Sequence, residues 1–169
     1  MQIIVDPVGF IRYLGHNSPC ALGKGGLQRD KREGDGATPV GTFTMGRIFY
    51  RADRTTRPLS GLPCHPISPD MGWCDDPDHP DYNRLITLPH PARHEKLWRD
   101  DHVYDVVVEL GYNTEPVIAG RGSAIFIHVA KPDYAPTEGC IALKFEDLLD
   151  LLQMCNEGDN VTIPAPQSP

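Results

Sequence analysis

The chain has 169 residues, which suits one domain with its own apolar core. Its formal net charge of −7 disfavours sequence-independent binding to nucleic acid, so we expect no nucleic-acid partner. The 16 glycines and 17 prolines disfavour a helical bundle and favour a β-rich domain with many turns. No signal peptide and no apolar run of transmembrane length is visible, so we expect a cytoplasmic protein without a membrane segment.

The first fifty residues alternate loosely between apolar and polar residues. Residues 2–14 predict two strands with a turn at Asp6-Pro7, and a loop follows at 16–19. A short strand is expected at 20–23. The charged, glycine-rich segment 28–39 indicates an exposed loop, and 41–50 alternates as a strand.

Residues 51–57 form a basic patch, Arg-Ala-Asp-Arg-Thr-Thr-Arg. A solvated loop explains such a charge run. The functional alternative is a cradle for substrate carboxylates, because arginine binds them bidentately.

The segment 58–91 is long, polar and proline-rich, and we interpret it as a wall of the active-site cleft. In that interpretation Trp73 and Tyr82 pack on the substrate, and Asn83 and Arg84 bond its polar groups. The alternative is that these four residues only hold the loop together.

Cysteine and histidine usage bounds the metal chemistry. A zinc site would draw on Cys64, His65, Cys74 and His79, but the spacing matches no common zinc motif, so we expect no metal and no cofactor. A zinc-dependent hydrolase stays a distant alternative. The five cysteines are odd in number and irregularly spaced, which favours free thiols in a reducing compartment over a disulfide framework.

The second half of the chain has clearer periodicity. We expect a short helix or turn at 92–98 and a strong strand at 103–110. Apolar residues at three-to-four spacing predict one amphipathic helix over 145–155, and a last strand follows at 160–163. Residues 1–163 show no domain boundary, and 164–169 are expected to be a flexible tail.

The stretch from Ile125 to Leu143 carries the chemistry. A buried strand ends at His128, a turn-rich loop follows, and Cys140 opens a second apolar run. A thiol near an imidazole can form a thiolate–imidazolium pair, which is a strong nucleophile at neutral pH. The amides of Gly139 and Cys140 are then placed to stabilise an oxyanion. The alternative is a buried structural cysteine beside a core histidine.

Two motifs resemble a known family. His128 followed by Thr137-Glu138-Gly139-Cys140, together with Thr38-Pro39-Val40-Gly41-Thr42-Phe43, is similar to the YkuD-type L,D-transpeptidases, cysteine acyltransferases of peptidoglycan. The resemblance covers roughly residues 1–163. It implies a mainly β (β-rich α+β) fold, a β-sandwich of two mixed sheets with one C-terminal helix.

The resemblance also implies roles for individual residues. Cys140 would attack the bond between the L-centre of the third stem residue and a terminal D-alanine, with His128 as base. The carbonyl of Val129 would orient the imidazole. Ala142 stands where many members carry a substrate-binding arginine, so we look to Arg84 and then Lys131 for the missing cation. Thr137 completes the expected substrate contacts.

The acceptor of the acyl group decides the activity. Without a visible export signal, we favour a cytosolic L,D-carboxypeptidase of muropeptide recycling, with water as acceptor and the protein acting as a monomer. One alternative is an L,D-transpeptidase that cross-links the wall, in the periplasm or cell wall if a leader was removed. Another is a non-catalytic domain that binds wall peptides.

Overall fold

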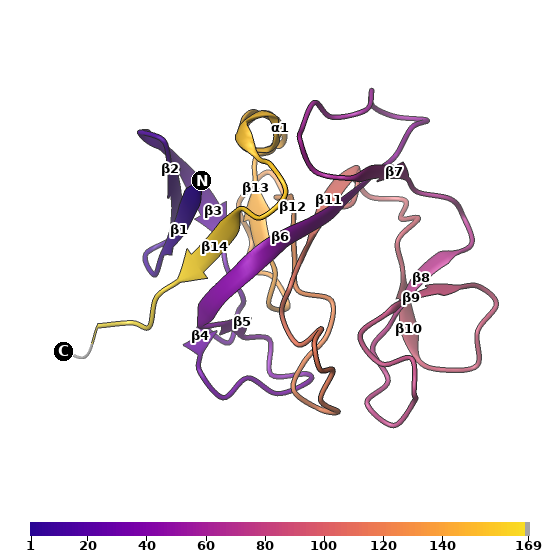
Figure 1. Cartoon of the computed structure of the whole chain (residues 1–169). Coiled ribbons are helices and arrows are strands. Elements are labelled where there is room, and N and C mark those ends of the chain that lie inside the picture. Colours follow the sequence, from indigo (N-terminus) through magenta and orange to yellow (C-terminus); the bar gives the residue numbers. More distant parts are fainter. Residues whose placement is uncertain (168–169) are drawn as a thin grey trace.

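A computed structural model describes residues 1–167, and strands make up most of its regular structure (Figure 1). The described residues contain one helix, α1 (Phe145–Met154), where the sequence pattern predicted it. The strands are, in chain order, β1 (Gln2–Asp6), β2 (Phe10–Tyr13), β3 (His16–Ala21), β4 (Leu27–Gln28), β5 (Thr38–Pro39), β6 (Gly41–Tyr50), β7 (Cys64–Pro66), β8 (Met71–Cys74), β9 (Leu85–Thr87), β10 (His94–Lys96), β11 (Val106–Leu110), β12 (Phe126–Val129), β13 (Ile141–Leu143) and β14 (Asn160–Ile163).

The main sheet closes on itself. It has nine strands in the order β11-β12-β13-β3-β2-β1-β14-β6-β7, and an additional β11–β6 pairing joins its two sides. The mainly β class is confirmed, but the expected sandwich of two packed sheets is wrong. The reason lies in β6, whose ten residues pair with β14 at Gly41–Thr44 and with β11 from Met45 onward. One long strand therefore joins both halves into a barrel-like sheet.

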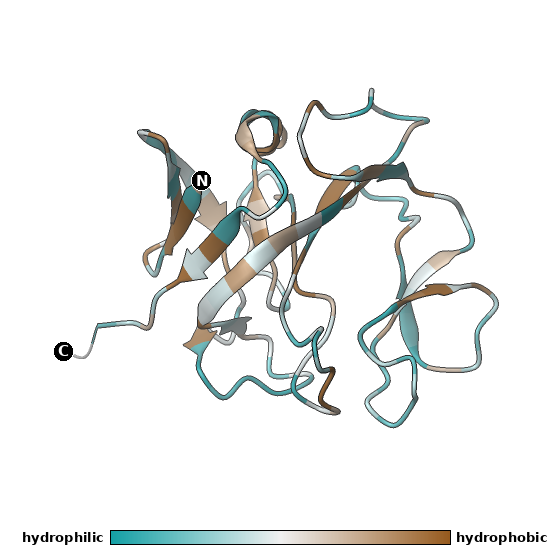
Figure 2. Ribbon diagram, viewed as in Figure 1, coloured by the Kyte–Doolittle hydropathy of each residue, from teal (hydrophilic) through white to brown (hydrophobic). Residues whose placement is uncertain are grey.

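The interior of this closed sheet holds the main apolar core. Every strand of the ring sends alternate residues inward, so hydrophobic and hydrophilic residues alternate along β14 in Figure 2. The helix α1 adds Leu148, Leu151 and Leu152, each fully buried. Burial of such a side chain stabilises the fold by about 1.5–3 kcal/mol. The amphipathic stripe of the helix thus covers one opening of the barrel.

A second apolar cluster lies on the outside of the barrel. The small sheet β10-β8-β9 stands beside the barrel (Figure 1) and packs on its outer face through Trp73. Trp73 meets Phe126 of β12 edge-on, with 5.0 Å between ring centroids. Because β11 lies between the two clusters, Val106 and Val108 face the interior while Val107 faces outward. This two-sided burial explains the unbroken valine run.

Several local expectations fail where short strands form. The expected loop 58–91 contains β7, β8 and β9, and β10 replaces the expected helix or turn at 92–98. The expected loop 16–19 belongs to β3, which pairs with β2 along its length. Two- to six-residue strands carry too little periodicity to be read locally, so tertiary pairing decides them.

The expected strands at 41–50 and 160–163, and the pair within 2–14, are confirmed. Residues 164–167 have neither helix nor strand, and 168–169 of the expected flexible tail lie outside the described residues. None of the described helical residues makes a stretch long and apolar enough to cross a bilayer.

Candidate active site

Of the expected catalytic pair, His128 lies on β12, and Cys140 lies immediately before the neighbouring strand β13. These strands run parallel, with Ile127 opposite Ile141 and His128 opposite Ala142. Because side chains alternate, Ile127 and Ile141 point into the barrel, whereas His128 and Cys140 lie on the outer face. The two side chains therefore lie on the same face of the sheet, with Cys140 two positions before Ala142, the residue opposite His128.

His128 is buried and held by its δ nitrogen. Nδ1 lies 2.9 Å from the carbonyl oxygen of Val129. Since a carbonyl only accepts, Nδ1 carries the proton and Nε2 keeps its lone pair when the ring is neutral. Burial lowers the pKa of His128 to about 4, so the ring is neutral at pH 7. The geometry gives a base with Nε2 free to take a proton.

Cys140 is a buried neutral thiol in this structure. Its Sγ donates to the carbonyl of Ala124 at 3.2 Å and accepts from the amide of Phe126 at 3.4 Å. Burial, and then the charge of Glu95, raise the pKa of Cys140 to about 12. Within residues 1–167 no hydrogen bond joins Cys140 to His128. A thiolate–imidazolium pair is therefore not the resting state, and proton transfer has to accompany substrate attack.

The turn before Cys140 is built by Thr137 and Gly139. The Thr137 hydroxyl donates to the Cys140 carbonyl at 2.6 Å and accepts from the Gly139 amide at 3.1 Å. Gly139 has φ +137°, and a Cβ there would lie 2.7 Å from the Ala37 carbonyl oxygen. The Gly139 amide is thus occupied, which does not support its expected oxyanion contact. Thr137 likewise shapes the turn instead of facing substrate.

The two motifs singled out in the sequence meet at this turn. The Thr38 hydroxyl donates to the carbonyl of Gly139 at 2.9 Å and accepts from the Gly23 amide at 2.9 Å. Thr38 is fully buried, although 101 residues separate it from Gly139. The early Thr-Pro motif therefore supports the cysteine turn.

Trp73 and Asn83 support the backbone that contacts the Cys140 thiol. Both are buried, and Asn83 Oδ1 accepts from Trp73 Nε1 at 2.9 Å and from the Ala124 amide at 3.0 Å. Its Nδ2 donates to the carbonyls of Tyr112 and Asn113. All four bonds stay within the protein, so the structure gives no support to the expected substrate contacts of Trp73 and Asn83, which stay predictions. Asn83 instead fixes Ala124, whose carbonyl receives the Cys140 thiol.

Tyr82 also turns inward. Only 2% of it is exposed, its hydroxyl donates to Glu33 Oε1 at 2.8 Å, and it accepts from the Gly122 amide at 2.9 Å. The Ser123 hydroxyl donates to the same Glu33 oxygen. Tyr82 therefore anchors residues 122–124. It also lines a surface hollow together with Arg84, and its expected packing on substrate stays a prediction.

The two expected cations lie in different places. Arg84 is exposed and lines a surface hollow of about 490 Å³, to which neither Cys140 nor His128 contributes. Lys131 is exposed, and its charge helps to lower the pKa of His128, after burial and the charge of Arg99. Lys131, not Arg84, is the one whose charge reaches the imidazole.

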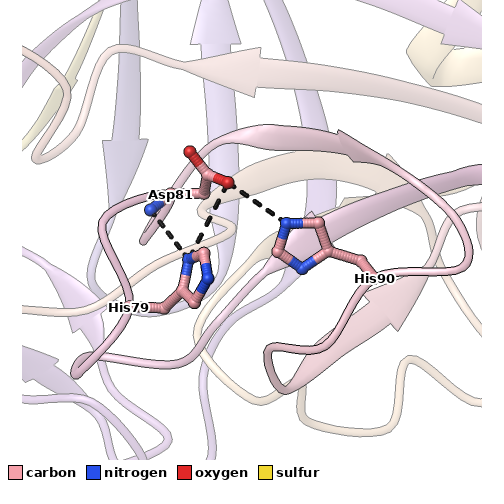
Figure 3. A group of neighbouring side chains, drawn as sticks. All are labelled: His79, Asp81 and His90. Carbon is pink, nitrogen blue, oxygen red and sulfur yellow. Dashed lines mark hydrogen bonds and ion pairs between the residues drawn. The ribbon is translucent and has the colours of Figure 1, made fainter.

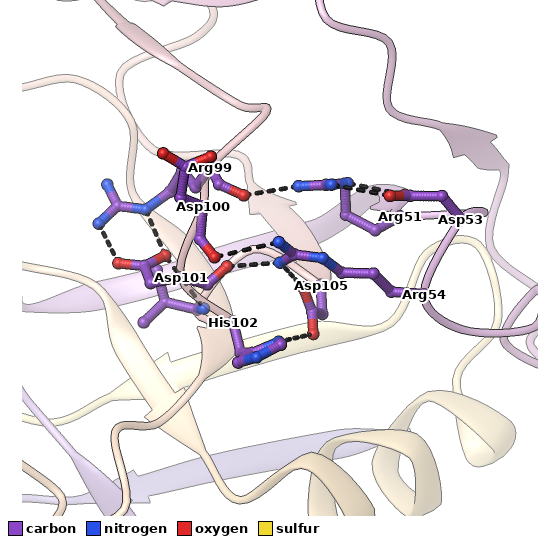
Figure 4. A network of polar contacts seen from close by, with 9 residues as sticks. Arg51, Asp53, Arg54, Arg99, Asp100, Asp101, His102 and Asp105 are labelled. Carbon is purple, nitrogen blue, oxygen red and sulfur yellow. Dashed lines mark hydrogen bonds and ion pairs between the residues drawn. The ribbon is translucent and has the colours of Figure 1, made fainter.

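Two arginines of the basic patch 51–57, Arg51 and Arg54, bind groups within the protein. Arg51 is buried and pairs bidentately with Asp53 at 2.8 Å (Figure 4). Its guanidinium also stacks over Trp98, 3.6 Å from the ring centroid. Arg54 binds Asp105 at 2.8 Å and two backbone carbonyls nearby. Arg51 and Arg54 fasten residues 99–105 and are paired within the protein, which does not support the expected carboxylate cradle.

The sequence analysis missed charged residues beside the thiol. Lys31 is buried and donates to Asp35 at 2.7 Å, and its charge opposes the rise in the pKa of Cys140. Glu95 of β10 accepts from the Tyr104 hydroxyl at 2.7 Å, and burial raises the pKa of Glu95 to about 7. A single carboxylate carries no local signal of its tertiary neighbours.

The four residues of the zinc alternative do not gather. Cys64 and Cys74 lie in separate apolar clusters, and His79 instead groups with Asp81 and His90 (Figure 3). His90 Nε2 lies 3.1 Å from Asp81 Oδ2. However, Nδ1 of each histidine accepts a backbone N–H, so a neutral ring carries its proton on Nε2. Neither ring has a lone pair left for a metal, and this group does not fit one.

Known proteins were compared with this chain by sequence and by structure. The sequence profile of the L,D-transpeptidase catalytic domain, YkuD, matches residues 3–163. No curated protein is significantly similar. The solved structures similar to this chain include the helical cell shape determining protein Pgp2 from Campylobacter jejuni, at 16% identity and TM-score 0.47, over 99% of this chain and 48% of that one. An L,D-transpeptidase from Mycobacterium smegmatis is 15% identical with TM-score 0.44, over 97% and 58% of the two chains. This chain thus spans about half the length of those structures.

Proposed function

Because this chain belongs to the L,D-transpeptidase catalytic domain family, we propose that Cys140 is the nucleophile of an acyl transfer on peptidoglycan stem peptides. One observation carries the assignment of the pair. His128 and Cys140 share the outer face of adjacent strands, and the Val129 carbonyl holds the imidazole with Nε2 unprotonated.

The reaction begins from the neutral pair. As Cys140 Sγ attacks the carbonyl carbon of the L-centre, its proton moves to His128 Nε2. The tetrahedral intermediate collapses, the C–N bond to D-alanine breaks, and the imidazolium gives its proton to the leaving amine. A thioester remains on Cys140. Water then attacks the thioester carbon while His128 takes a proton from that water. The C–S bond breaks, the imidazolium returns the proton to Cys140 Sγ, and the tripeptide leaves with a new carboxyl group.

We infer that water is the physiological acceptor and the cytosol the compartment. All five cysteines are unpaired and buried, which suits a reducing environment. An enzyme in that compartment would meet soluble turnover peptides, not cross-linked wall. The protein would then be an L,D-carboxypeptidase that trims tetrapeptides to tripeptides, acting as a monomer.

Incubation with disaccharide-tetrapeptide, followed by mass spectrometry, tests the proposal. We expect tripeptide and free D-alanine from the wild type and neither from Cys140→Ala, whose fold should be unchanged by circular dichroism. Accumulation of dimeric cross-linked products would instead identify the activity as transpeptidation. Turnover by Cys140→Ala would end the cysteine mechanism.

The substrate carboxylate needs a cation, because Ala142 has no charge. We propose Lys131, whose charge reaches His128, rather than Arg84 on its separate hollow. Lys131→Ala should raise KM by the equivalent of about 1.5–3 kcal/mol, the usual value of a charged hydrogen bond. Arg84→Ala is the matched control and should leave KM unchanged. The opposite pattern would move the carboxylate site to the hollow of Arg84.

A further inference from the structure

Tyr104 lies against the proposed general base. It is 6% exposed, and its ring meets the His128 imidazole edge-on, with 5.4 Å between centroids and 68° between planes. The same ring packs on Phe126 at 6.0 Å. Tyr104 thus fills the outer face of the barrel beside both catalytic strands.

Glu95 holds Tyr104 from the other side. The Tyr104 hydroxyl donates to Glu95 Oε1 at 2.7 Å, a short charge-assisted hydrogen bond when the carboxylate is ionised. Glu95 sits on β10, opposite Trp73 of β8, so the bond ties the small sheet to the barrel. The Arg99 guanidinium stacks over the Tyr104 ring at 5.2 Å and is itself paired with Asp101. The ring is therefore fixed at its hydroxyl and on one of its faces.

His128 needs such a support. Its imidazole has one hydrogen bond within the described residues, from Nδ1 to the Val129 carbonyl. A single bond at Nδ1 leaves the ring free to tilt about that contact, which would move Nε2 away from the line of proton transfer. The edge of Tyr104 stands in the way of that tilt. Misplacement of a base by about 1 Å can cost about a hundredfold in rate.

We propose that Glu95 and Tyr104 are a positioning pair for His128, with Glu95 acting through the Tyr104 hydroxyl. This inference rests on the proposed function, in which His128 is the base. In this inference the small β10-β8-β9 sheet contributes to the reaction, because Glu95 lies on its strand β10 and binds Tyr104 beside the barrel. Neither residue exchanges a proton with substrate.

Variants of the pair separate positioning from bulk packing. Tyr104→Phe and Glu95→Leu should each lower kcat five- to twentyfold while KM stays within twofold. Glu95→Gln keeps an acceptor oxygen for the hydroxyl and should retain at least half of the wild-type kcat. The Tyr104→Phe/Glu95→Leu double variant should be no slower than the slower single variant, because both changes remove one hydrogen bond. Tyr112→Phe is the matched control: it loses a partly buried hydroxyl bond to the Arg121 carbonyl and should keep full activity.

A second measurement does not depend on turnover. The imidazole carbon-bound proton resonances of His128 should shift in Tyr104→Phe and Glu95→Leu, because the neighbouring ring moves, and stay near wild type in Glu95→Gln. Additive losses in the double variant, or unchanged His128 resonances in Tyr104→Phe, would overturn the positioning role. If the wild type releases no D-alanine, the proposed function fails, and the resonances still decide whether the pair holds His128. Thermal melting of each variant identifies any loss that is due to unfolding.

Discussion

Replacing Asn83 by alanine removes four hydrogen bonds at once. The change leaves Trp73 Nε1 and the Ala124 amide without an acceptor, and two carbonyls without their donor. At about 1 kcal/mol for each bond, the loss is about 4 kcal/mol. Asn83 also has φ +56°, a conformation that asparagine adopts more readily than alanine. We expect Asn83→Ala to lower the free energy of unfolding by roughly 4–5 kcal/mol.

Urea denaturation followed by tryptophan fluorescence measures this loss. In a thermal melt the same loss lowers the melting temperature by roughly 8–20 °C for a domain of this size. Asn83→Gly is the matched variant, because it removes the same four bonds but relieves the backbone. It should be more stable than Asn83→Ala by roughly 0.5–1 kcal/mol, the left-handed penalty less the extra unfolded-state entropy of glycine.

Activity should fall together with stability in both Asn83 variants. Ala124 has φ +54° and is held in place by Asn83, and its carbonyl accepts the Cys140 thiol. Turnover measured well below the melting temperature should therefore drop even where the variants are folded. A loss of less than about 1.5 kcal/mol in Asn83→Ala, with normal turnover, would refute Asn83 as the support of the thiol.

Three further changes test the rest of the site. Gly139→Ala should lower the free energy of unfolding by at least about 2 kcal/mol in urea, since its φ is +137° and a carbonyl oxygen lies 2.7 Å from the new Cβ. Arg51→Ala should lower the free energy of unfolding by about 3 kcal/mol and leave KM unchanged. The control Arg57→Ala, at an exposed position, should change neither quantity. A raised KM in Arg51→Ala would instead support binding of a substrate carboxylate by the basic patch. The pKa of His128 is lowered to about 4, so its contribution to stability is lost as pH falls from 6.5 to 4; the pKa of Glu95 is raised to about 7, so its contribution is lost as pH rises from 4.5 to 7. In the wild type these two pH dependences of the free energy of unfolding oppose each other. As the pH rises from 4.5 to 6.5, Glu95→Gln should therefore gain roughly 2 kcal/mol more stability than the wild type does, measured by urea denaturation at each pH. Parallel plots of stability against pH for the two proteins would contradict this.

The sequence alone determined the features that depend on neighbours along the chain. The helix at 145–154, the long strand β6, the strand that carries His128 and the strand that follows Cys140 all follow from local periodicity. The two motifs around Thr38 and Cys140 named the family because each has a specific local spacing. Residues this close in sequence constrain one another whatever the rest of the chain does.

The tertiary structure decided everything that depends on distant partners. Closure of the barrel required β6 to pair with both β14 and β11, which no local pattern encodes. Asn83 was expected to face substrate because it is polar and lies in a loop, yet burial makes it satisfy four distant groups instead. Glu95 reaches Tyr104 only because the small sheet packs on the barrel. A polar residue type predicts that a buried side chain will form hydrogen bonds, but only the packing of the whole chain determines their partners.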